Sequence, residues 1–172
     1  MADDESELLA IVSALPCIDW QGRAWRHMFN DYPPQRINTG GARWNPPGVG
    51  AIYLTLDPAT ALAEGQHAID VQPRRTHARR VLYQVELSVS QLVDLTAPGA
   101  LKRVSLTASD IGNDDHTACR RVGAAVAELG RGGLLVPSAR TPGTNLVVLI
   151  DPGGAEDSMV IVERAVVPVD GR

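Results

Sequence analysis

Lysine and cysteine are scarce in this chain of 172 residues. Lys102 is the only lysine, and no Gly-rich segment with a phosphate-binding lysine occurs, which excludes a P-loop nucleotide site. Cys17 and Cys119 have neither a metal-binding nor a redox spacing, so we expect both to be reduced. The four histidines lack the paired spacing of a zinc site, and no serine stands in a nucleophile-elbow motif. We therefore expect no bound metal and none of the common hydrolase mechanisms.

Long apolar runs and an excess of positive charge are also missing. No run approaches the ~20 residues that a membrane-spanning helix needs. The acidic start at residues 1–5 lacks the positive charge of a signal peptide, so we expect a cytoplasmic protein that does not contact membranes. The formal net charge of -4 disfavours direct nucleic-acid binding through a broad basic face.

The remaining composition predicts one globular domain with an α+β fold. The chain is 44% hydrophobic and 21% charged, a usual balance, and is long enough to bury a single core. Hydrophobic periodicity predicts helices over residues 6–15, 59–69 and 117–129 and strands over residues 22–29, 51–56, 81–89, 133–136, 145–150 and 159–169. Because no regular βαβ alternation occurs, we expect mixed or antiparallel sheets with a few flanking helices. We assign residues 1–22 to an N-terminal helix and lead-in, and residues 23–169 to the main body of the domain.

Several local signals mark where these elements begin and end. Pro16 should end the first helix. Asp57-Pro58 is typical of a helix start, because Asp accepts hydrogen bonds from exposed N–H groups and Pro fits the first helical position. Gly130 stands where a left-handed helix cap is expected. The prolines and glycines of residues 32–50 predict a shaped loop.

The aromatic residues and one basic stretch each allow two interpretations. Six of the seven aromatic residues lie in the first third of the chain, and they are Trp20, Trp25, Phe29, Tyr32, Trp44 and Tyr53. They could form a local core or a pocket that stacks planar ligand rings. The stretch at residues 74–80, with four arginines, is typical of a solvated loop, and alternatively contacts an acidic partner.

Four segments together resemble one known family. In chain order they are Trp25-Arg26-His27, the Gly40–Gly48 segment GGARWNPPG leading into Ile52-Tyr53-Leu54, Ala61-Leu62-Ala63-Glu64, and the Gly133–Arg140 segment GLLVPSAR followed by Thr144–Val148. Their types and order resemble the RES domain, which is named for arginine, glutamate and serine positions. The resemblance spans roughly residues 26–150, and Arg-Trp-Asn-Pro-Pro-Gly is its most specific part.

The resemblance implies a fold similar to ADP-ribosyltransferases and a toxin that consumes NAD+ or transfers its ADP-ribose. It also implies a co-encoded, Xre-like antitoxin protein that blocks the active site. NAD+ would be the substrate and inorganic phosphate a possible co-substrate, so we expect no resident cofactor.

The residues suit this chemistry. Cleavage of the nicotinamide–ribose bond develops positive charge on the ribose, which a carboxylate such as Glu64 stabilises. Glu64 shares a helix face with the small residues Ala61 and Ala68, which leaves room for a ligand, although a solvent-exposed helix glutamate is the alternative. Arg26 and Arg43 resemble the two family arginines that would bind the pyrophosphate, because arginine matches phosphate oxygens in a bidentate way.

The other candidate residues follow from the resemblance. Tyr53 resembles the tyrosine expected to pack on nicotinamide, and a core tyrosine is the alternative. Ser138, at the end of a strand, could bond a ribose or an amide; Thr117 is a competing hydroxyl, for which we favour a helix-capping role. Asn145 is either a ligand contact or a turn former. His116 departs from the bulkier aromatic residue of many relatives.

Two catalytic functions and one non-catalytic function fit the sequence. The first is a toxin that depletes NAD+ by phosphorolysis or hydrolysis. The second is a mono-ADP-ribosyltransferase that modifies a specific target protein from the same donor pocket. The third is a binding module that grips its partner through the arginine-rich stretch, which leaves Arg26, Arg43, Tyr53 and Glu64 unexplained as a set.

Overall fold

The computed structural model describes residues 2–72, 74, 77–150 and 159–168. Its helices and strands in chain order are α1 (Ala2–Ser13), β1 (Cys17–Phe29), β2 (Gly50–Thr55), α2 (Pro58–Val71), β3 (Arg80–Asp94), α3 (Ala100–Arg103), α4 (Ala108–Gly112), α5 (Thr117–Glu128), β4 (Gly133–Pro137), β5 (Thr144–Ile150) and β6 (Val160–Val166). The α+β prediction is confirmed. No helix in this described part is long and apolar enough to cross a membrane.

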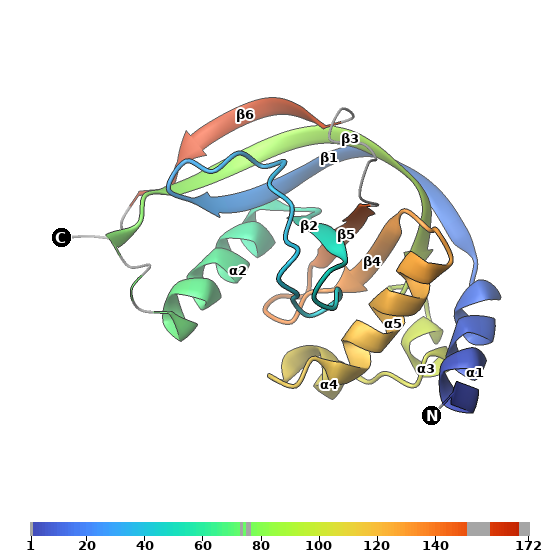
Figure 1. Ribbon diagram of the computed structural model, residues 1–172. Coiled ribbons are helices and arrows are strands. Elements are labelled where there is room, and N and C mark those ends of the chain that lie inside the picture. Colours follow the sequence, from blue (N-terminus) through green and yellow to red (C-terminus); the bar gives the residue numbers. More distant parts are fainter. Residues whose placement is uncertain (1, 73, 75–76, 151–158, 169–172) are drawn as a thin grey trace.

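The strands form one mixed sheet that closes on itself. Its order is β1-β2-β5-β4-β3-β6, and β1 also pairs with β3, so five strands make a ring and β6 lies outside it. The long antiparallel pair β1–β3 carries most of the pairing, whereas β1 meets β2 at Trp25 and Thr55 alone among the described residues. Within the described part of the chain, only the β3–β4 pairing is parallel. In Figure 1 the long strands arch over the short ones.

The three short strands separate two hydrophobic cores. Consecutive residues of a strand point to opposite faces, so Leu134 and Val147 enter the first core while Leu135 and Leu146 enter the second. The first core is completed by apolar residues of α1, α3, α4 and α5, and the second by residues of β1 and β3. Figure 1 shows these helices on one side of the short strands and the long strands on the other.

The predicted helix signals near Asp57 and Gly130 are confirmed. Asp57 is the N-cap of α2, and its Oδ1 accepts a hydrogen bond from the backbone N–H of Thr60 at 2.7 Å. Gly130 has a φ of 65°, the left-handed conformation expected after α5. The helix α2 therefore starts at a fixed point directly after β2, which determines where its side chains meet the sheet.

The first helix was predicted out of position, because it begins at Ala2 and ends at Ser13 rather than covering residues 6–15. Its end is fixed from a distance: Arg131 donates from Nη2 to the carbonyl oxygen of Ser13 at 2.7 Å and from Nη1 to that of Leu15 at 3.1 Å. A residue more than 110 positions away satisfies the last carbonyls, so local periodicity could not predict this boundary.

Other boundaries differ too. β1 begins at Cys17 rather than at residue 22, and β3 extends to Asp94 rather than to residue 89, because the two strands support each other over nearly their whole length. The short helices α3 and α4 were not predicted. Part of the basic stretch, Arg75 and Thr76, and the last residue of the predicted strand 159–169 lie outside the described residues.

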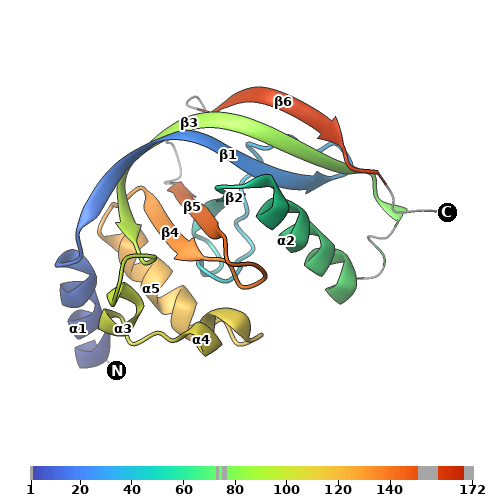
Figure 2. The same ribbon diagram turned by 180° about the vertical axis from the view of Figure 1, so that it is seen from behind.

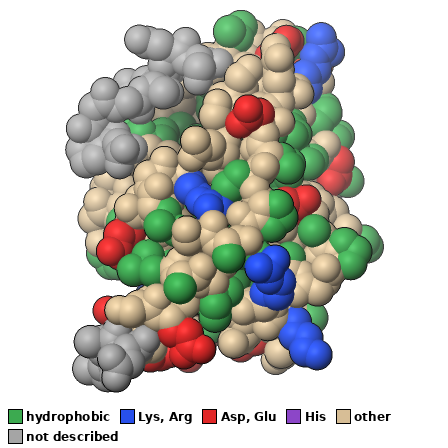
Figure 3. Space-filling view, turned by 90° about the vertical axis from the view of Figure 1, so that its right-hand side faces the viewer, with side chains coloured by type: hydrophobic (Ala, Val, Ile, Leu, Met, Phe, Trp, Pro, Cys, Tyr) green, Lys and Arg blue, Asp and Glu red, His purple; other side chains and the backbone are tan. Residues whose placement is uncertain are grey.

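Charges of both signs are interspersed on the face shown in Figure 3, which looks at the molecule from the right-hand side of Figure 1. Blue and red side chains alternate there with hydrophobic ones, and the face carries no broad basic surface. Arg121 of α5 forms an ion pair with Asp4 of α1 at 2.5 Å, which joins these two helices.

Candidate active site

A cavity of about 590 Å³ lies where α2 meets the ends of β1 and β2, within the size range of small-molecule pockets. Its walls come from the second half of β1, the loop that follows it, the end of β2, one face of α2 and the start of β5. The helix comes close to the sheet because of Gly65: a Cβ there would lie 2.5 Å from the ring of His27. A glycine inside this helix is therefore required by packing.

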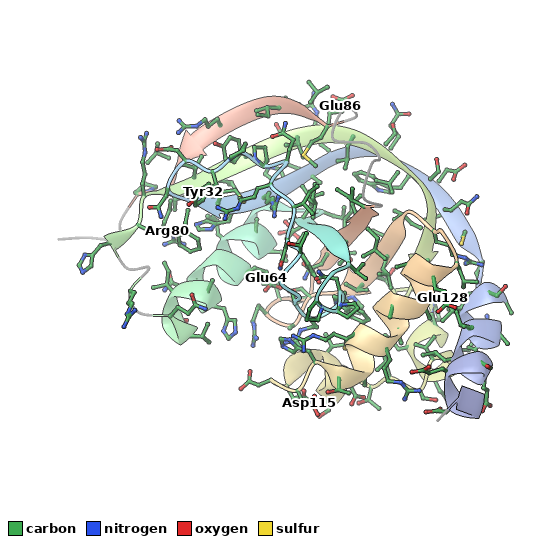
Figure 4. The ribbon with its side chains drawn as sticks, in the orientation of Figure 1. Tyr32, Glu64, Arg80, Glu86, Asp115 and Glu128 are labelled. Atoms are coloured by element: carbon green, nitrogen blue, oxygen red, sulfur yellow. The ribbon has the colours of Figure 1, made fainter. Side chains whose placement is uncertain are left out.

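Glu64 lies at the edge of this cavity with its carboxylate held in place. Its Oε1 accepts hydrogen bonds from Ser138 Oγ at 2.8 Å and from Asn145 Nδ2 at 3.1 Å. Figure 4 shows Glu64 near the centre of the molecule, between α2 and β2. Among the described residues no hydrogen bond engages Oε2, so this oxygen is available to a ligand.

Asn145 contributes a second free polar atom to the site. Its Oδ1 is buried and has no hydrogen-bond partner among the described residues. Buried amide oxygens are normally paired, so an unpaired one beside Glu64 is suited to accept a hydrogen bond from a ligand hydroxyl or amide. The structure thus brings together Glu64, Ser138 and Asn145, which the sequence had singled out separately.

Arg26 lies on β1 and lines the same cavity. Its Nη1 donates to the carbonyl oxygens of Pro34 and Arg36, the latter at 2.8 Å, so the side chain also fixes the loop after β1. Burial, together with the neighbouring Arg36 charge, lowers the pKa of Arg26 from 12.5 to about 10. Arg26 therefore stays positively charged at neutral pH and gives this wall of the cavity a fixed cation.

Tyr53 lines the cavity with its ring and uses its hydroxyl elsewhere. The hydroxyl donates to Asn45 Oδ1 at 2.7 Å and accepts from the backbone N–H of Trp44 at 2.9 Å. Burial raises the pKa of the Tyr53 hydroxyl well above its usual value, so it stays protonated. Asn45 in turn donates from Nδ2 to the backbone oxygens of Asn38 and Val49, so the Gly-rich loop is tied to the wall of the cavity.

Two candidates from the sequence neither line this cavity nor contact Glu64. Arg43 is absent from its lining and donates from Nη1 to the backbone oxygen of Asn113 at 2.8 Å. Thr117 is the exposed first residue of α5, and it does not cap the helix as we favoured: its own N–H donates to Asp115 Oδ1 at 2.9 Å. His116, rather than Thr117, occupies the N-cap position and has no side-chain capping bond.

Both interpretations of the aromatic cluster hold in part. Trp25, Phe29, Tyr32 and Tyr53 line the cavity. Trp44, by contrast, is 2% exposed and belongs to the first core. The cluster therefore builds a ligand-sized pocket and the packing behind it.

A family model of the RES domain matches residues 16–168. The chain belongs to the RES-domain family. Relatives named "NAD(+) phosphorylase MbcT", from Mycobacterium bovis and Mycobacterium tuberculosis, are 36% identical over 115 residues, which make up 63% of this chain. The match spans 60% of the length of these relatives.

A solved structure supports the fold over a longer stretch. A chain from the crystal structure of the M. tuberculosis MbcT–MbcA toxin–antitoxin complex superposes with a TM-score of 0.79 at 27% identity. The superposition covers 95% of this RES-domain chain and 93% of the other. The single-domain architecture with a mixed sheet and few helices is thus shared with a toxin–antitoxin component.

Several polar residues around the RES-domain cavity were missed from the sequence as site residues. Arg36 lies over the ring of Tyr32, with its Cζ 3.7 Å from the ring centroid, and both line the cavity. His27 accepts at Nε2 from Arg80 Nε at 3.0 Å. Burial and the Arg80 charge lower the pKa of His27 to about 4. The sequence signal for His27 as a site residue is its position directly after Arg26 in one of the segments that resemble the RES domain.

Proposed function

We propose that this RES-domain protein is the toxin of a toxin–antitoxin pair and cleaves the nicotinamide–ribose bond of NAD+. The observation that carries the proposal is the Glu64 carboxylate, held by Ser138 and Asn145 at the edge of a cavity lined by Arg26 and Tyr53. The names of the MbcT relatives, NAD(+) phosphorylases, support the same reaction. ADP-ribose would pass to inorganic phosphate or to water.

Each residue has a role that its position suits. Glu64 Oε2 faces the ribose and stabilises the positive charge that develops as nicotinamide leaves, since a fixed carboxylate acts most strongly where water is excluded. The Tyr53 ring stacks on nicotinamide, and Asn145 Oδ1 accepts a hydrogen bond from the carboxamide or a ribose hydroxyl. Arg26 and Arg36 attract the pyrophosphate, whose charge needs cations on this wall.

Arg43 has a less direct role. Its guanidinium lies outside the cavity lining, so we assign it to the rim of the Gly-rich loop, where it influences an extended dinucleotide rather than the reacting sugar. The chemistry requires no metal and no resident cofactor. Transfer of ADP-ribose to a target protein uses the same donor cavity and remains the second candidate function.

The decisive experiment measures NAD+ consumption by the purified protein, with and without inorganic phosphate, beside Glu64→Gln. Removal of a charge-stabilising carboxylate should lower the rate by at least ~100-fold. Glu128→Gln is the matched control, because Glu128 is exposed on α5, away from the cavity (Figure 4). Equal rates for Glu64→Gln and the wild type would refute the proposal, and slow NAD+ loss with a labelled protein acceptor would favour the second function.

The antitoxin is part of the same proposal. The structural neighbour comes from a toxin–antitoxin complex, which supports a protein partner, and we infer that an Xre-like antitoxin covers the cavity. Co-expression with the neighbouring open reading frame should restore growth, and the purified complex should consume NAD+ more slowly than the free chain. A complex as active as the free chain would show that the partner binds elsewhere.

A further inference from the structure

The turn between β4 and β5, residues 138–143, packs along one side of α2 directly beside the cavity. Ser138 bonds to Glu64, and Thr141 Oγ1 lies 2.7 Å from Thr60 Oγ1. At Gly143 a Cβ would lie 2.1 Å from Thr60 Oγ1, so the turn sits as close to the helix as its backbone permits. Figure 2 shows this turn next to α2 from behind.

Arg140 lies at the middle of this turn and reaches the helix at His67. Its Nη2 lies 2.7 Å from His67 Nε2. Arginine carries only hydrogen-bond donors, so His67 accepts at Nε2 in this contact. Among the described residues no carboxylate forms an ion pair with Arg140, and its Nε is buried without a hydrogen-bond partner.

A buried guanidinium N–H without an acceptor is an unusual feature. Buried donors are nearly always paired, and guanidinium groups form their strongest hydrogen bonds with the oxygens of carboxylates and phosphates. His67 satisfies one nitrogen of Arg140 without neutralising its charge. Arg140 as a whole is partly exposed, so its guanidinium offers a positive charge to an anion, and its buried Nε is a donor that still lacks an acceptor among the described residues.

Arg140 lies close to Glu64, on the side away from the cavity. Residues 64 and 67 are one helical turn apart, so their Cβ atoms are about 5–6 Å from each other. Ser138 Oγ connects the two groups, because it donates to Glu64 Oε1 at 2.8 Å and accepts from the backbone N–H of Arg140 at 3.1 Å. Ala61, Gly65 and Ala68 line the cavity, whereas Arg140 and His67 lie outside its lining, on the other side of Glu64.

We propose that Arg140, positioned by His67, binds the inorganic phosphate that accepts ADP-ribose beside Glu64. The inference rests on the proposed cleavage of NAD+ and names the acceptor for it. A phosphate dianion next to a carboxylate would be repelled without a cation, and Arg140 supplies that cation on the side that the dinucleotide leaves open. Arg26 and Arg36, which line the cavity itself, would bind the pyrophosphate.

The reaction at this subsite is balanced without a separate base. The bond between C1 of the ribose and the nicotinamide nitrogen breaks, and its electron pair neutralises the pyridinium. A lone pair of an oxygen of HPO₄²⁻ forms the new C–O bond. The products are neutral nicotinamide and ADP-ribose 1-phosphate on the nicotinamide-side ribose, with no proton to remove at the moment of attack.

The test compares steady-state kinetics of Arg140→Gln with the wild type while phosphate and NAD+ are varied separately. We expect the KM for phosphate to rise by at least ~10-fold and the KM for NAD+ to change by less than about 3-fold, since a lost ground-state contact affects only its own ligand. Product analysis by mass spectrometry should show a shift from ADP-ribose phosphate toward ADP-ribose. Arg121→Gln, an exposed arginine on α5, is the matched control.

Further variants keep the outcome decisive. Arg140→Lys retains the positive charge. Its KM for phosphate should lie between those of the wild type and Arg140→Gln. His67→Gln preserves an acceptor for Arg140 and should change the phosphate KM less than His67→Leu does. An unchanged phosphate KM in Arg140→Gln, or in His67→Leu where Arg140→Gln does not fold, or a rise in the NAD+ KM alone, would overturn the inference.

The two proposals fail in different ways. If the wild type degrades NAD+ to ADP-ribose at a rate that does not depend on phosphate, the phosphate subsite is refuted and NAD+ cleavage stands. If the wild type consumes no NAD+ under either condition, the proposed function fails first.

Discussion

At Gly123, α5 crosses the loop that carries Trp44. A Cβ at this position would lie 1.7 Å from the Trp44 carbonyl oxygen, which belongs to the backbone and cannot rotate away. Gly123→Ala should therefore lower the free energy of unfolding by about 3 kcal/mol or more, because the helix and the loop must separate. Chemical denaturation followed by circular dichroism measures the change.

Gly112→Ala is the control for this substitution. A Cβ at Gly112 meets no atom within 4 Å, so we expect a change of less than about 1 kcal/mol in either direction. Similar losses in the two variants would show that the close approach between α5 and the Trp44 carbonyl does not determine stability.

His27 should make stability depend on pH in a defined window. Its pKa is about 4 in the folded protein and about 6.5 in the unfolded chain, so between these values the unfolded chain binds the extra proton. Stability should therefore fall as the pH drops from 6.5 toward 4, by roughly 1–2 kcal/mol once partial exposure is allowed for. Urea denaturation at pH 7 and pH 5 measures the difference.

The comparison with His27→Gln isolates this contribution from that of the carboxylates. Glutamine can still accept a hydrogen bond from Arg80 but does not titrate. The variant should lose less stability between pH 7 and pH 5 than the wild type. The same loss in both proteins would assign the pH dependence to other groups.

At the scale of single residues, the structure brings together side chains that the recognisable segments had marked as candidates. Glu64 comes from one segment and Ser138 and Asn145 from another, yet both donate to one oxygen of the Glu64 carboxylate. Arg43 was placed with Arg26 because both types suit phosphate, but a loop residue can face either way, and Arg43 faces Asn113. Arg140 was not a candidate, because its unpaired Nε exists only once the turn has packed on α2.

At the scale of helices and strands, the start of α2 is stabilised by one side chain, that of Asp57. Asp57 accepts from the backbone N–H of Thr60 through Oδ1 and from the Thr60 hydroxyl through Oδ2, each at 2.7 Å. Asp57→Ala should lower the free energy of unfolding by about 1–2 kcal/mol, because two donors at the helix start lose their partner. Thermal denaturation of the two proteins tests this expectation.

Asp70→Ala serves as the comparison near the other end of α2. Asp70 is exposed and, among the described residues, accepts only from Gln66 Nε2 at 3.0 Å, so its loss should change stability by less than about 0.5 kcal/mol. Equal effects at both ends would mean that the Asp57 cap contributes no more than a surface contact.

Element boundaries were predictable where the signal is local. Strands β2 and β5 were predicted to within one residue, since each is a compact apolar run bounded by polar or flexible residues. The short helix α4 was missed, although Thr107 and Asp110 form a capping box at its start, because five residues are too few to show a period. The first residues of β1 pair with β3, and this pairing cannot be predicted from the residues of β1 alone.

For the molecule as a whole, the two cores share the short strands and should unfold together. Leu134 of the first core and Leu146 of the second are both fully buried on adjacent strands. Leu134→Ala and Leu146→Ala should each lower stability by about 2–5 kcal/mol and shift one common transition. Far-UV circular dichroism and tryptophan fluorescence should report the same midpoint.

Val160→Ala on β6 is the control, because Val160 is 62% exposed and little packing is lost. A change of less than about 1 kcal/mol is expected there. Two separate transitions in either core variant would show that the helical side and the long strands unfold independently.

The strand order was beyond reach of the sequence. Helix and strand types follow from periodicity, and the α+β class follows from their succession. The closing of the ring through β1 and β3 depends on pairing between residues more than 50 positions apart, and the parallel pairing of β3 with β4 depends on the whole core. The family resemblance indicated candidate residues such as Arg26, Tyr53 and Glu64, and the clustered aromatic residues indicated a pocket, but neither predicted how the strands are ordered.

The alternation of residues along β5 also limits which insertions and deletions this gene can accept during evolution. Asn145 reaches Glu64, and the next residue, Leu146, points to the opposite face. With the turn held in place, deletion of one strand residue before Asn145 would exchange these faces and place Leu146 against the carboxylate. Length variation among descendants of this protein should therefore be absent from this strand.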